Sequence, residues 1–259
     1  MSTEQQPGER RNAARPLRIQ SWSGARNIST AFMYSWAQRA DTTVVDEPLY
    51  AAYLDRHDRG HPMTAEVLAA QSSDPADVVR SVVFGDCATP VLFLKQMAHH
   101  LRGLDAELVA ELLGGTENIL LTRAPADMLA SLSVQLPHCE LDDTGLPEQV
   151  ELLESILDAG GAPVVVDSAV LLADPTAVLT ELCRRLGIAF DAAMLSWEPG
   201  PKPYDGVWAP AWYDNVHRTS GFGASRSHDR GLEGRLLDVL AEAQPLYDRL
   251  AQFLIEPES

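Results

Sequence analysis

The sequence predicts one α/β domain built as a three-layer sandwich, in which helices cover both faces of a central parallel sheet. Its 259 residues are enough for one large domain of this class. Short apolar runs alternate with helical patterns, an order typical of parallel sheets. No internal repeat or second domain boundary interrupts this alternation. We expect residues 1–16, which are polar and charged, to be a disordered tail and residues 17–259 to form the domain.

Five short apolar runs are predicted as strands. They are Leu17–Trp22, the stretch around Val44 and Val45, Val91–Lys95, Glu117–Arg123 and Pro163–Asp167. Ile28, Phe32 and Trp36 recur every four residues and predict a first helix. Further helical patterns are found at Ala106–Leu113, Asp127–Leu136, Glu148–Leu157, Thr176–Leu186 and Gly231–Phe253. Ligands of parallel α/β sheets bind at the carboxyl ends of the strands, so the residues there are the candidates for a site.

The turn after the first strand has the features of an anion-binding loop. Ser23–Ala25 are small enough for tight backbone curvature, and Arg26 adds a fixed positive charge. Asn27, Ser29 and Thr30 supply hydrogen-bond donors where a helix begins, and the positive end of that helix also favours an anion. The triphosphate signature G-x-x-x-x-G-K-[ST] is absent. The alternative is an ordinary helix capped by Asn27 or Ser29.

A second candidate anion site follows the strand Glu117–Arg123. Arg123 ends this strand, and Pro125 stands at a plausible first helical position. Ser131 lies eight residues after Arg123, within the first two turns of the helix. An Arg and a Ser placed in this way can bind one phosphate together. A surface ion pair of Arg123 and a packing role of Ser131 are the alternatives.

Together these residues resemble the sulfotransferase family, whose donor is 3'-phosphoadenosine 5'-phosphosulfate (PAPS). The family loop P-R-x-x-S-T is matched by residues 25–30, ARNIST, and the branch with V-D-E-P-L-Y by residues 45–50. The resemblance covers about residues 17–223 and implies a fold like that of P-loop nucleoside triphosphate hydrolases. It implies that Arg26, Ser29 and Thr30, with Asn27, hold the 5'-phosphosulfate, and that Arg123 and Ser131 hold the 3'-phosphate.

Two residues depart from the family loop. Ala25 replaces the usual proline, and Ile28 stands where many relatives have glycine. Glycine reaches left-handed backbone conformations without steric cost, whereas isoleucine does not. We therefore expect Ile28 to keep the loop out of the most strained turn geometries.

Asp46 and Glu47 follow the second predicted strand. Sulfuryl transfer to an alcohol needs a base that takes the hydroxyl proton. In relatives with this Glu-Pro element the glutamate is the proposed base, so the resemblance implies this role for Glu47. Asp46 is expected to orient a loop or a cationic side chain. A solvated Asp-Glu turn before Pro48 is the alternative.

Lys95 falls at the end of the third predicted strand. The resemblance implies a lysine that steadies the bridging oxygen of the donor as negative charge develops there. In animal cytosolic relatives the base is a histidine two residues after this lysine, but that position here is Met97. His99 remains a rival base, and His100 is expected to be a surface or helix-capping histidine.

The stretch 215–222, NVHRTSGF, resembles the C-terminal nucleotide loop of the family. The resemblance implies that Arg218, Ser220 and Gly221 contact the donor. The preceding segment carries many aromatic residues, which are interpreted mainly as packing that holds the loop, or as part of an acceptor pocket or adenine stack.

A net charge of −17 makes nucleic acid and anionic membranes unfavourable partners. The acceptor is therefore expected to be a small neutral or cationic molecule rather than a polyanionic sugar. No run approaches 18 apolar residues and no apolar signal segment is seen at the start, so a cytoplasmic location is expected. The three cysteines lack metal-site spacing, and no metal is expected. A homodimer is left open.

We interpret the chain as an enzyme that transfers a sulfuryl group from PAPS to a hydroxyl or amine of a small acceptor, releasing 3'-phosphoadenosine 5'-phosphate (PAP). One alternative is a P-loop kinase of small molecules, with Asp167 holding magnesium. That alternative needs a lysine where Ile28 stands. The other is a protein that binds bisphosphonucleotides without catalysis.

Overall fold

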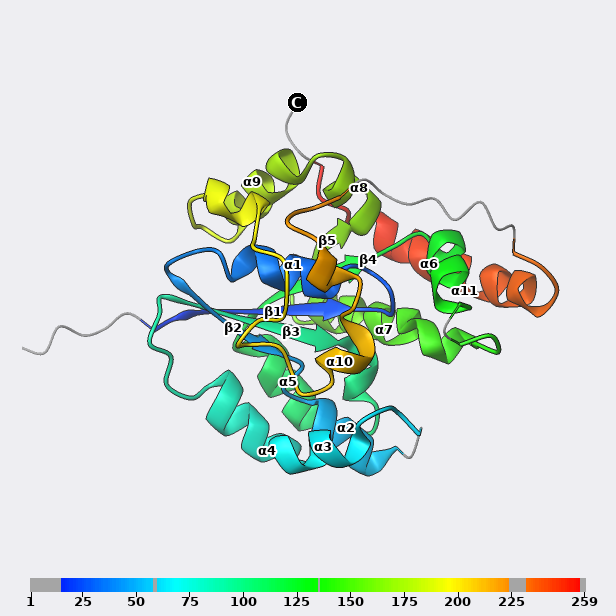
Figure 1. Cartoon of the computed structure of the whole chain (residues 1–259), viewed down its shortest axis with the longest axis horizontal. Coiled ribbons are helices and arrows are strands. Elements are labelled where there is room, and N and C mark those ends of the chain that lie inside the picture. The colour runs from blue at the N-terminus through cyan, green and yellow to red at the C-terminus, as the bar shows by residue number, and fades with distance from the viewer. Residues whose placement is uncertain (1–14, 58–59, 135, 224–231, 257–259) are drawn as a thin grey trace, which may run out of the picture.

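The computed structural model describes residues 15–57, 60–134, 136–223 and 232–256, and one parallel sheet of five strands lies at its centre (Figure 1). The strands are β1 (Leu17–Ser23), β2 (Thr42–Asp46), β3 (Val91–Met97), β4 (Glu117–Thr122) and β5 (Val164–Asp167). All five predicted strands are present, and all the pairings are parallel. The predicted tail lies almost entirely outside the described residues.

The spatial order of the strands is β2-β3-β1-β4-β5, with β1 in the middle. From β1 the chain builds β2 and β3 on one side, and it then crosses to the other side for β4 and β5. The carboxyl ends of β1 and β4 therefore lie where the direction of winding reverses, the position at which open α/β sheets bind ligands. Arg26 and Arg123 follow these two strands.

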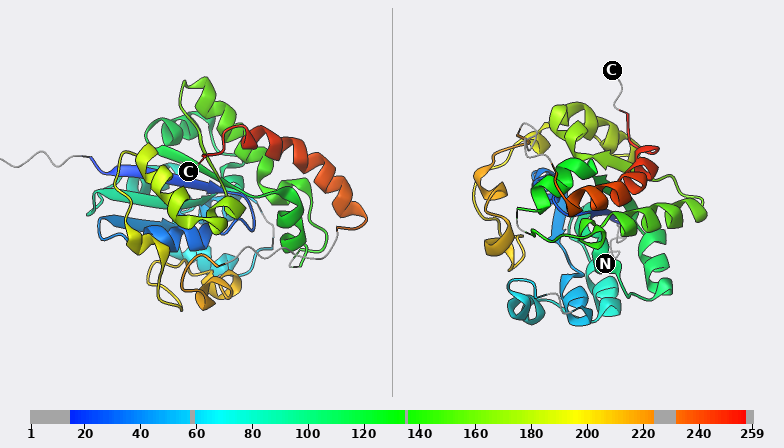
Figure 2. Two further views of the ribbon diagram at one scale, coloured as in Figure 1. Left: turned by 90° about the horizontal axis from the view of Figure 1, so that it is seen from above. Right: turned by 90° about the vertical axis from the view of Figure 1, so that its right-hand side faces the viewer.

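Helices cover both faces of the sheet. One face carries α1 (Ser29–Trp36), α8 (Ser168–Ala173), α9 (Pro175–Arg185) and the 3₁₀ turn η4 (Ala192–Leu195). The other face carries α4 (Pro75–Val78), the π-helical turn η1 (Val79–Val83), α5 (Ala106–Gly114), α7 (Leu146–Asp158) and α11 (Arg235–Ala251). The short helix α6 (Pro125–Leu132) packs against α11, which Figure 2 shows on the outside of the domain.

The remaining elements are short. They are α2 (Tyr50–Arg56), α3 (Thr64–Ala70), α10 (Ala209–Trp212) and the 3₁₀ turns η2 (Ala98–Leu101), η3 (Leu141–Thr144) and η5 (Val216–Arg218). The patterns did not predict α2 or α3, because seven residues show too little of a 3.6-residue period. The predicted helix at Asp127–Leu136 ends earlier, at Leu132, ahead of Pro137. The predicted start of the last helix, Gly231, lies outside the described residues.

In the part of the chain that the structure describes, none of the helices combines the length and the apolar character that a membrane span requires.

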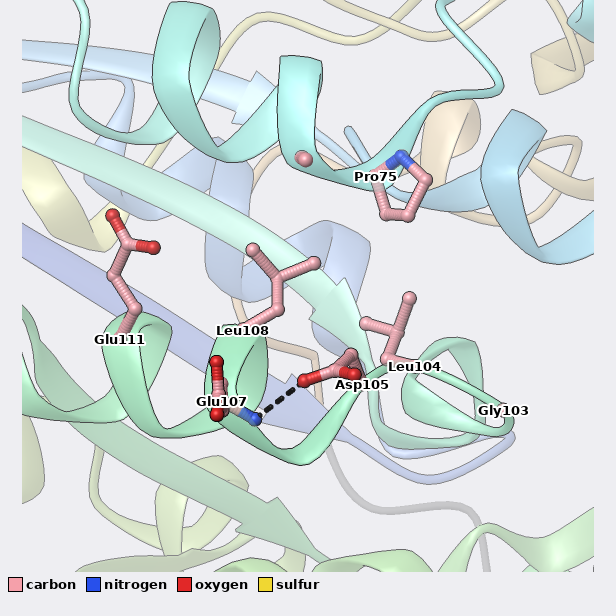
Figure 3. A pocket seen from close by; sticks show the side chains of 8 residues that line it. Pro75, Gly103, Leu104, Asp105, Glu107, Leu108 and Glu111 are labelled. Carbon is pink, nitrogen blue, oxygen red and sulfur yellow. Dashed lines mark hydrogen bonds between the residues drawn. The ribbon is translucent and has the colours of Figure 1, made fainter.

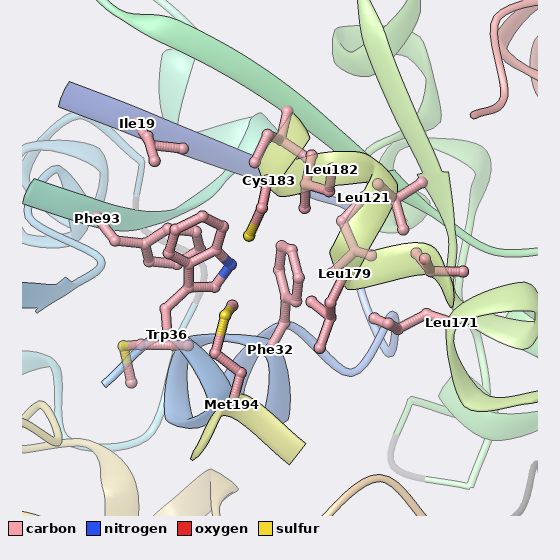
Figure 4. Close-up of a cluster of buried hydrophobic side chains, with 14 of the residues drawn as sticks. Ile19, Phe32, Trp36, Phe93, Leu121, Leu171, Leu179, Leu182, Cys183 and Met194 are labelled. Carbon is pink, nitrogen blue, oxygen red and sulfur yellow. The ribbon is translucent and has the colours of Figure 1, made fainter. Parts of the chain in front are cut away.

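Aromatic side chains fill the core between α1 and the sheet. Phe32, Trp36 and Phe93 are fully buried, and Figure 4 shows them among aliphatic side chains of β4 and α9. Trp36 stacks on Phe93 with the ring centroids 4.9 Å apart, and Phe32 meets Phe93 edge-on at 5.6 Å. This packing fixes α1 on the sheet, so the position of its N-terminus relative to β1 is also fixed.

Phe32→Ala is expected to lower the free energy of unfolding by about 3–5 kcal/mol, because it leaves a cavity in a close-packed core. Chemical denaturation followed by circular dichroism measures this change. The control is Leu237→Ala. The Leu237 side chain is 51% exposed, so this substitution should change the free energy of unfolding by no more than about 0.5 kcal/mol. Similar small losses in both variants would contradict the assigned role of Phe32.

Candidate functional site

The loop between β1 and α1 is held tightly against η3. The amide of Ala25 donates to the carbonyl oxygen of Thr144 at 3.0 Å. A Cβ atom on Gly24 would lie only 2.4 Å from that same oxygen, so the close approach requires glycine. The loop therefore enters α1 along a path that tertiary contacts fix.

Two residues of this loop adopt left-handed backbone conformations. Arg26 has φ 60° and Ile28 has φ 58°. The expectation that Ile28 avoids strained geometry is therefore wrong: a β-branched residue occupies the position that glycine occupies in many relatives. Such residues cost roughly 1–3 kcal/mol each and cluster at functional sites. The surrounding contacts, and not the local sequence, impose this conformation.

The N-cap residue of helix α1 is Ile28, and no side chain caps the helix. The alternative of an ordinary helix capped by Asn27 or Ser29 is thus wrong. Asn27 instead points into the protein, where its Nδ2 donates to the carbonyl oxygen of Leu121 at 3.0 Å. Its Oδ1 is buried without a hydrogen-bond partner within the described structure. The first amides of α1, at Ser29 and Thr30, are left for another acceptor.

Arg26, Arg123 and Ser131 come together from three segments. The Nε atom of Arg26 donates to Ser131 Oγ at 3.1 Å, and Arg123 Nη1 donates to the carbonyl oxygen of Arg26 at 3.1 Å. Burial, and then the charge of Arg123, lower the pKa of the Arg26 guanidinium. Two half-buried cations and a hydroxyl at a strand switch point form a positive patch suited to an anion.

A buried charged cluster lies at the ends of β2 and β3. Lys95 Nζ donates to Asp46 Oδ1 at 3.0 Å, to Tyr213 OH at 2.8 Å and to Glu47 Oε1. These contacts use all three ammonium hydrogens. Burial alone would lower the pKa of Lys95, but the charges of Asp46 and Glu47 outweigh it and raise the pKa. Lys95 does not end its strand, because β3 continues to Met97.

Glu47 is enclosed and is not part of a solvated turn. Its exposed fraction is 7%, and that of Asp46 is 5%, so the alternative of a solvated Asp-Glu turn is wrong. The backbone of Glu47 has φ 38° and its amide donates to the carbonyl oxygen of Lys95 at 2.8 Å. Burial raises the pKa of the Glu47 carboxyl, Lys95 opposes the shift, and Asp46 adds to it. A carboxylate of this kind is a stronger base than an exposed one.

Asp46 orients both a cation and a loop, as its position in the sequence predicted. Besides Lys95, it accepts from the amide of Gly206 at 3.0 Å and from Tyr213 OH at 2.8 Å. Sequence reasoning missed Tyr213, which it grouped with the packing aromatics of the loop. The position of Tyr213, just after α10 and 167 residues after Asp46, gives no local signal of this contact.

His100 lies next to Glu47 in the buried cluster. His100 is 1% exposed, so the expectation of a surface or capping histidine is wrong. Its ring stacks on Tyr50 at 4.9 Å, and its Nε2 lies 3.7 Å from Glu47 Oε2. Burial, and then the neighbouring His99 and Lys95, lower the pKa of His100 well below its usual value. His99 lies edge-on to His100 with ring centroids 4.7 Å apart.

The predicted nucleotide loop is ordered by its own contacts. Arg218 is exposed and pairs with Asp214 at 3.0 Å. The carbonyl oxygen of Ser220 accepts from the amide of Trp197, and Gly221 pairs with Ser196 as an antiparallel bridge. The roles of Arg218, Ser220 and Gly221 towards a donor stay predictions.

Other polar groups have structural roles or lie elsewhere. Asp167, which the kinase alternative would use for magnesium, caps α8 through the amides of Ala169 and Val170. Among the described residues, no group of three or more His, Cys, Asp or Glu is arranged to hold a metal ion.

A cavity of about 370 Å³ lies between α4 and α5 (Figure 3). It is lined by Pro75, Ala76, Gly103, Leu104, Asp105, Glu107, Leu108 and Glu111. None of the predicted site residues lines this cavity. Its three carboxylates also disfavour an anionic ligand.

Comparison with known proteins gives matches over most of the chain. Two relatives from Arabidopsis thaliana, branched-chain-amino-acid aminotransferase-like proteins 1 and 2, are 38% and 36% identical over 238 and 233 residues. These matches cover 92% and 90% of this chain but only 42% and 41% of the relatives. The chain thus spans about two fifths of the length of these relatives.

Solved sulfotransferases share the fold. The sulfotransferase domain of the Synechococcus PCC 7002 olefin synthase matches 95% of this chain and 98% of its own, with TM-score 0.55 and 19% identity. The sulfotransferase of Alicyclobacillus acidocaldarius matches 92% of this chain and 95% of its own, with TM-score 0.56 and 14% identity. These neighbours confirm the predicted P-loop-like α/β fold.

The family assignment rests on a match at the level of the whole domain. The family model described as "Sulfotransferase domain" matches residues 17–252, which include the β1–α1 loop, the charged cluster and the loop of Arg218. The chain therefore belongs to the sulfotransferase domain family.

Proposed function

We propose that this protein transfers a sulfuryl group from PAPS to a hydroxyl or amine of a small-molecule acceptor. The observation that carries the proposal is the placement of two different sets of residues at one edge of the sheet. One set is a positive patch beside an uncapped helix end, and the other is a buried cluster that contains a carboxylate of raised pKa.

The residues of the first set fit the anionic donor. Arg26 contacts both Ser131 and Arg123, which supports one continuous site in which Arg123 and Ser131 hold the 3'-phosphate and Arg26 helps to hold the 5'-phosphosulfate. The free amides and hydroxyls of Ser29 and Thr30 suit the 5'-phosphosulfate. When bound, the donor supplies the sulfuryl group. The left-handed backbone at Ile28 supports this assignment, because a left-handed residue next to helical ones is a conformation in which successive amides can form an anion-binding nest.

The residues of the second set fit the chemistry at the acceptor. Glu47 takes the proton of the acceptor hydroxyl at a carboxylate oxygen as the new oxygen–sulfur bond forms. Lys95 holds that carboxylate in place through Oε1. To steady the leaving oxygen of the donor as well, Lys95 must give up one of its three present partners. Asp46 keeps the ammonium nearby in either position.

The acceptor is proposed to be small and neutral or cationic. The net charge of −17 and the excess of carboxylate over ammonium in the cluster disfavour polyanions. Aromatic rings of Tyr50, Tyr53 and His61 gather beside His100 and Glu47, and such rings bind planar or cationic groups. The names of the Arabidopsis relatives add branched-chain amino acids to the acceptors worth testing.

Calorimetric titration is expected to show that the protein binds PAP more tightly than AMP, because only PAP carries the 3'-phosphate that the patch would hold. Arg123→Ala should weaken PAP binding by roughly 10- to 100-fold, the value of one charged hydrogen bond. Arg80→Ala, whose side chain is 72% exposed, is the control and should not change affinity. Equal affinity for PAP and AMP, or preference for ATP, would refute the donor assignment.

Glu47→Gln is expected to lower turnover by roughly 10²–10⁴-fold while PAP affinity stays nearly unchanged, because it removes one general base. His99→Gln, measured in the same assay, separates the two candidate bases. A large loss in the glutamate variant alone assigns the base to Glu47. A large loss in the histidine variant alone would transfer the role to His99.

An acceptor screen with PAPS is expected to give turnover on small neutral or cationic alcohols and amines, because the acidic protein repels polyanions. The screen measures PAP release for small alcohols, amines, amino and hydroxy acids, and a heparin-like polymer. Comparable rates on the polymer and on small acceptors would contradict the charge argument.

A further inference from the structure

The hydroxyl of Tyr213 is the point at which the aromatic loop meets the charged cluster. It accepts from Lys95 Nζ at 2.8 Å and from Trp208 Nε1 at 3.1 Å, and it lies 2.8 and 3.0 Å from the two oxygens of Asp46. Because both of its neighbouring N–H groups donate to it, the hydroxyl hydrogen goes to Asp46. Tyr213 is 5% exposed, so water does not readily replace these contacts.

The charges of the cluster are not balanced. One ammonium, Lys95, stands between two carboxylates, Asp46 and Glu47, and all three side chains are almost fully removed from water. The two carboxylates therefore compete for the same cation. The Tyr213 hydroxyl donates to Asp46 and stabilises its negative charge. Asp46 therefore attracts the Lys95 ammonium less strongly than it would without the hydroxyl.

We propose that Tyr213 is a positioning residue, whose hydroxyl satisfies Asp46 and so keeps the Lys95 ammonium on Glu47. This role rests on the proposed function of Glu47 as the base. Without the hydroxyl, Lys95 moves towards Asp46, and Glu47 loses the cation that favours its ionised form. Glu47 would then stay protonated up to a higher pH, so the pH range in which it can act as a base would be narrower.

The other groups around Glu47 leave this effect in place. Glu47 is faced by Lys95 from β3, Asp46 from β2, His100 from η2, Tyr50 from α2 and Tyr213 from the segment after α10. Burial lowers the pKa of His100 and raises that of Tyr50, so both are neutral near pH 7 and add no charge. Lys95 is thus the cation that controls Glu47, and Asp46 is its competitor.

The test measures the protonation of Glu47 directly, by NMR of the glutamate carboxyl carbons in ¹³C-labelled protein over a pH series. The resonance of Glu47 is the one that Glu47→Gln removes. In Tyr213→Phe its midpoint should rise by about one pH unit or more, which corresponds to one hydrogen bond to a charged group. In Asp46→Asn, which removes the competing charge, the midpoint should fall.

Tyr247→Phe is the matched control, because it removes another tyrosine hydroxyl that bonds to an aspartate, Asp167, at 2.9 Å outside the cluster. It should leave the Glu47 midpoint unchanged. An unchanged midpoint in folded Tyr213→Phe would overturn the proposal, and so would a rise in Asp46→Asn. If Tyr213→Phe does not fold, the sign of the shift in Asp46→Asn decides.

Kinetics then separate this proposal from the proposed function. If the protein turns over PAPS, the acid limb of the pH profile of kcat/KM should move upward in Tyr213→Phe by the same amount as the NMR midpoint. A moved midpoint without any turnover of PAPS by the wild type would support the role of Tyr213 and refute the sulfotransferase reaction. Turnover of PAPS by the wild type, together with an unchanged Glu47 midpoint in Tyr213→Phe, would support the sulfotransferase reaction and refute the role of Tyr213.

Discussion

The buried contact of Lys95 with Asp46 and Glu47 is the interaction on which the arrangement of the site depends. Asp46 stands opposite Lys95 in the parallel register of β2 and β3, so strand pairing itself brings these charges together. Buried ions are stable only when paired and hydrogen-bonded. Because the cluster needs more donors than Lys95 supplies, it also binds the Gly206 amide and the Tyr213 hydroxyl. The sheet thereby fixes the position of a loop that lies far away in the sequence.

Backbone strain gathers at the same edge of the sheet. Arg26, Ile28 and Glu47 all adopt positive φ, and each begins or adjoins a segment of the site. Such conformations persist only where surrounding contacts determine them. The contacts are present: Thr144 holds the β1–α1 loop, and Lys95 holds Glu47 through both its backbone and its side chain. The aromatic packing of Phe32 and Trp36 keeps the start of α1 in register with these contacts.

The sequence predicted the sheet because runs such as VVV at 164–166 are short and apolar. It also predicted Arg26 at one anion site and Arg123 with Ser131 at another, and the structure brings these residues into contact because strand ends in a parallel sheet share an edge. It could not predict the backbone of Ile28, since tertiary contacts impose a conformation that isoleucine disfavours. The positions of Tyr213 and His100 depend on the path of loops and on stacking with Tyr50, neither of which follows from local pattern.

The shared hydroxyl of Tyr213 has a consequence for how this protein can evolve. A change at Asp46, Lys95 or Tyr213 leaves the other two with an unmatched charge or hydrogen bond at a buried position, so these positions are expected to covary as a unit. Tyr50 of α2 packs beside the unit, edge-on to Trp208 at 5.0 Å, and its ring also meets that of His61 in the loop after α2. Substitutions of those aromatic residues can therefore change which acceptor is preferred, while Asp46, Lys95 and Tyr213 stay the same.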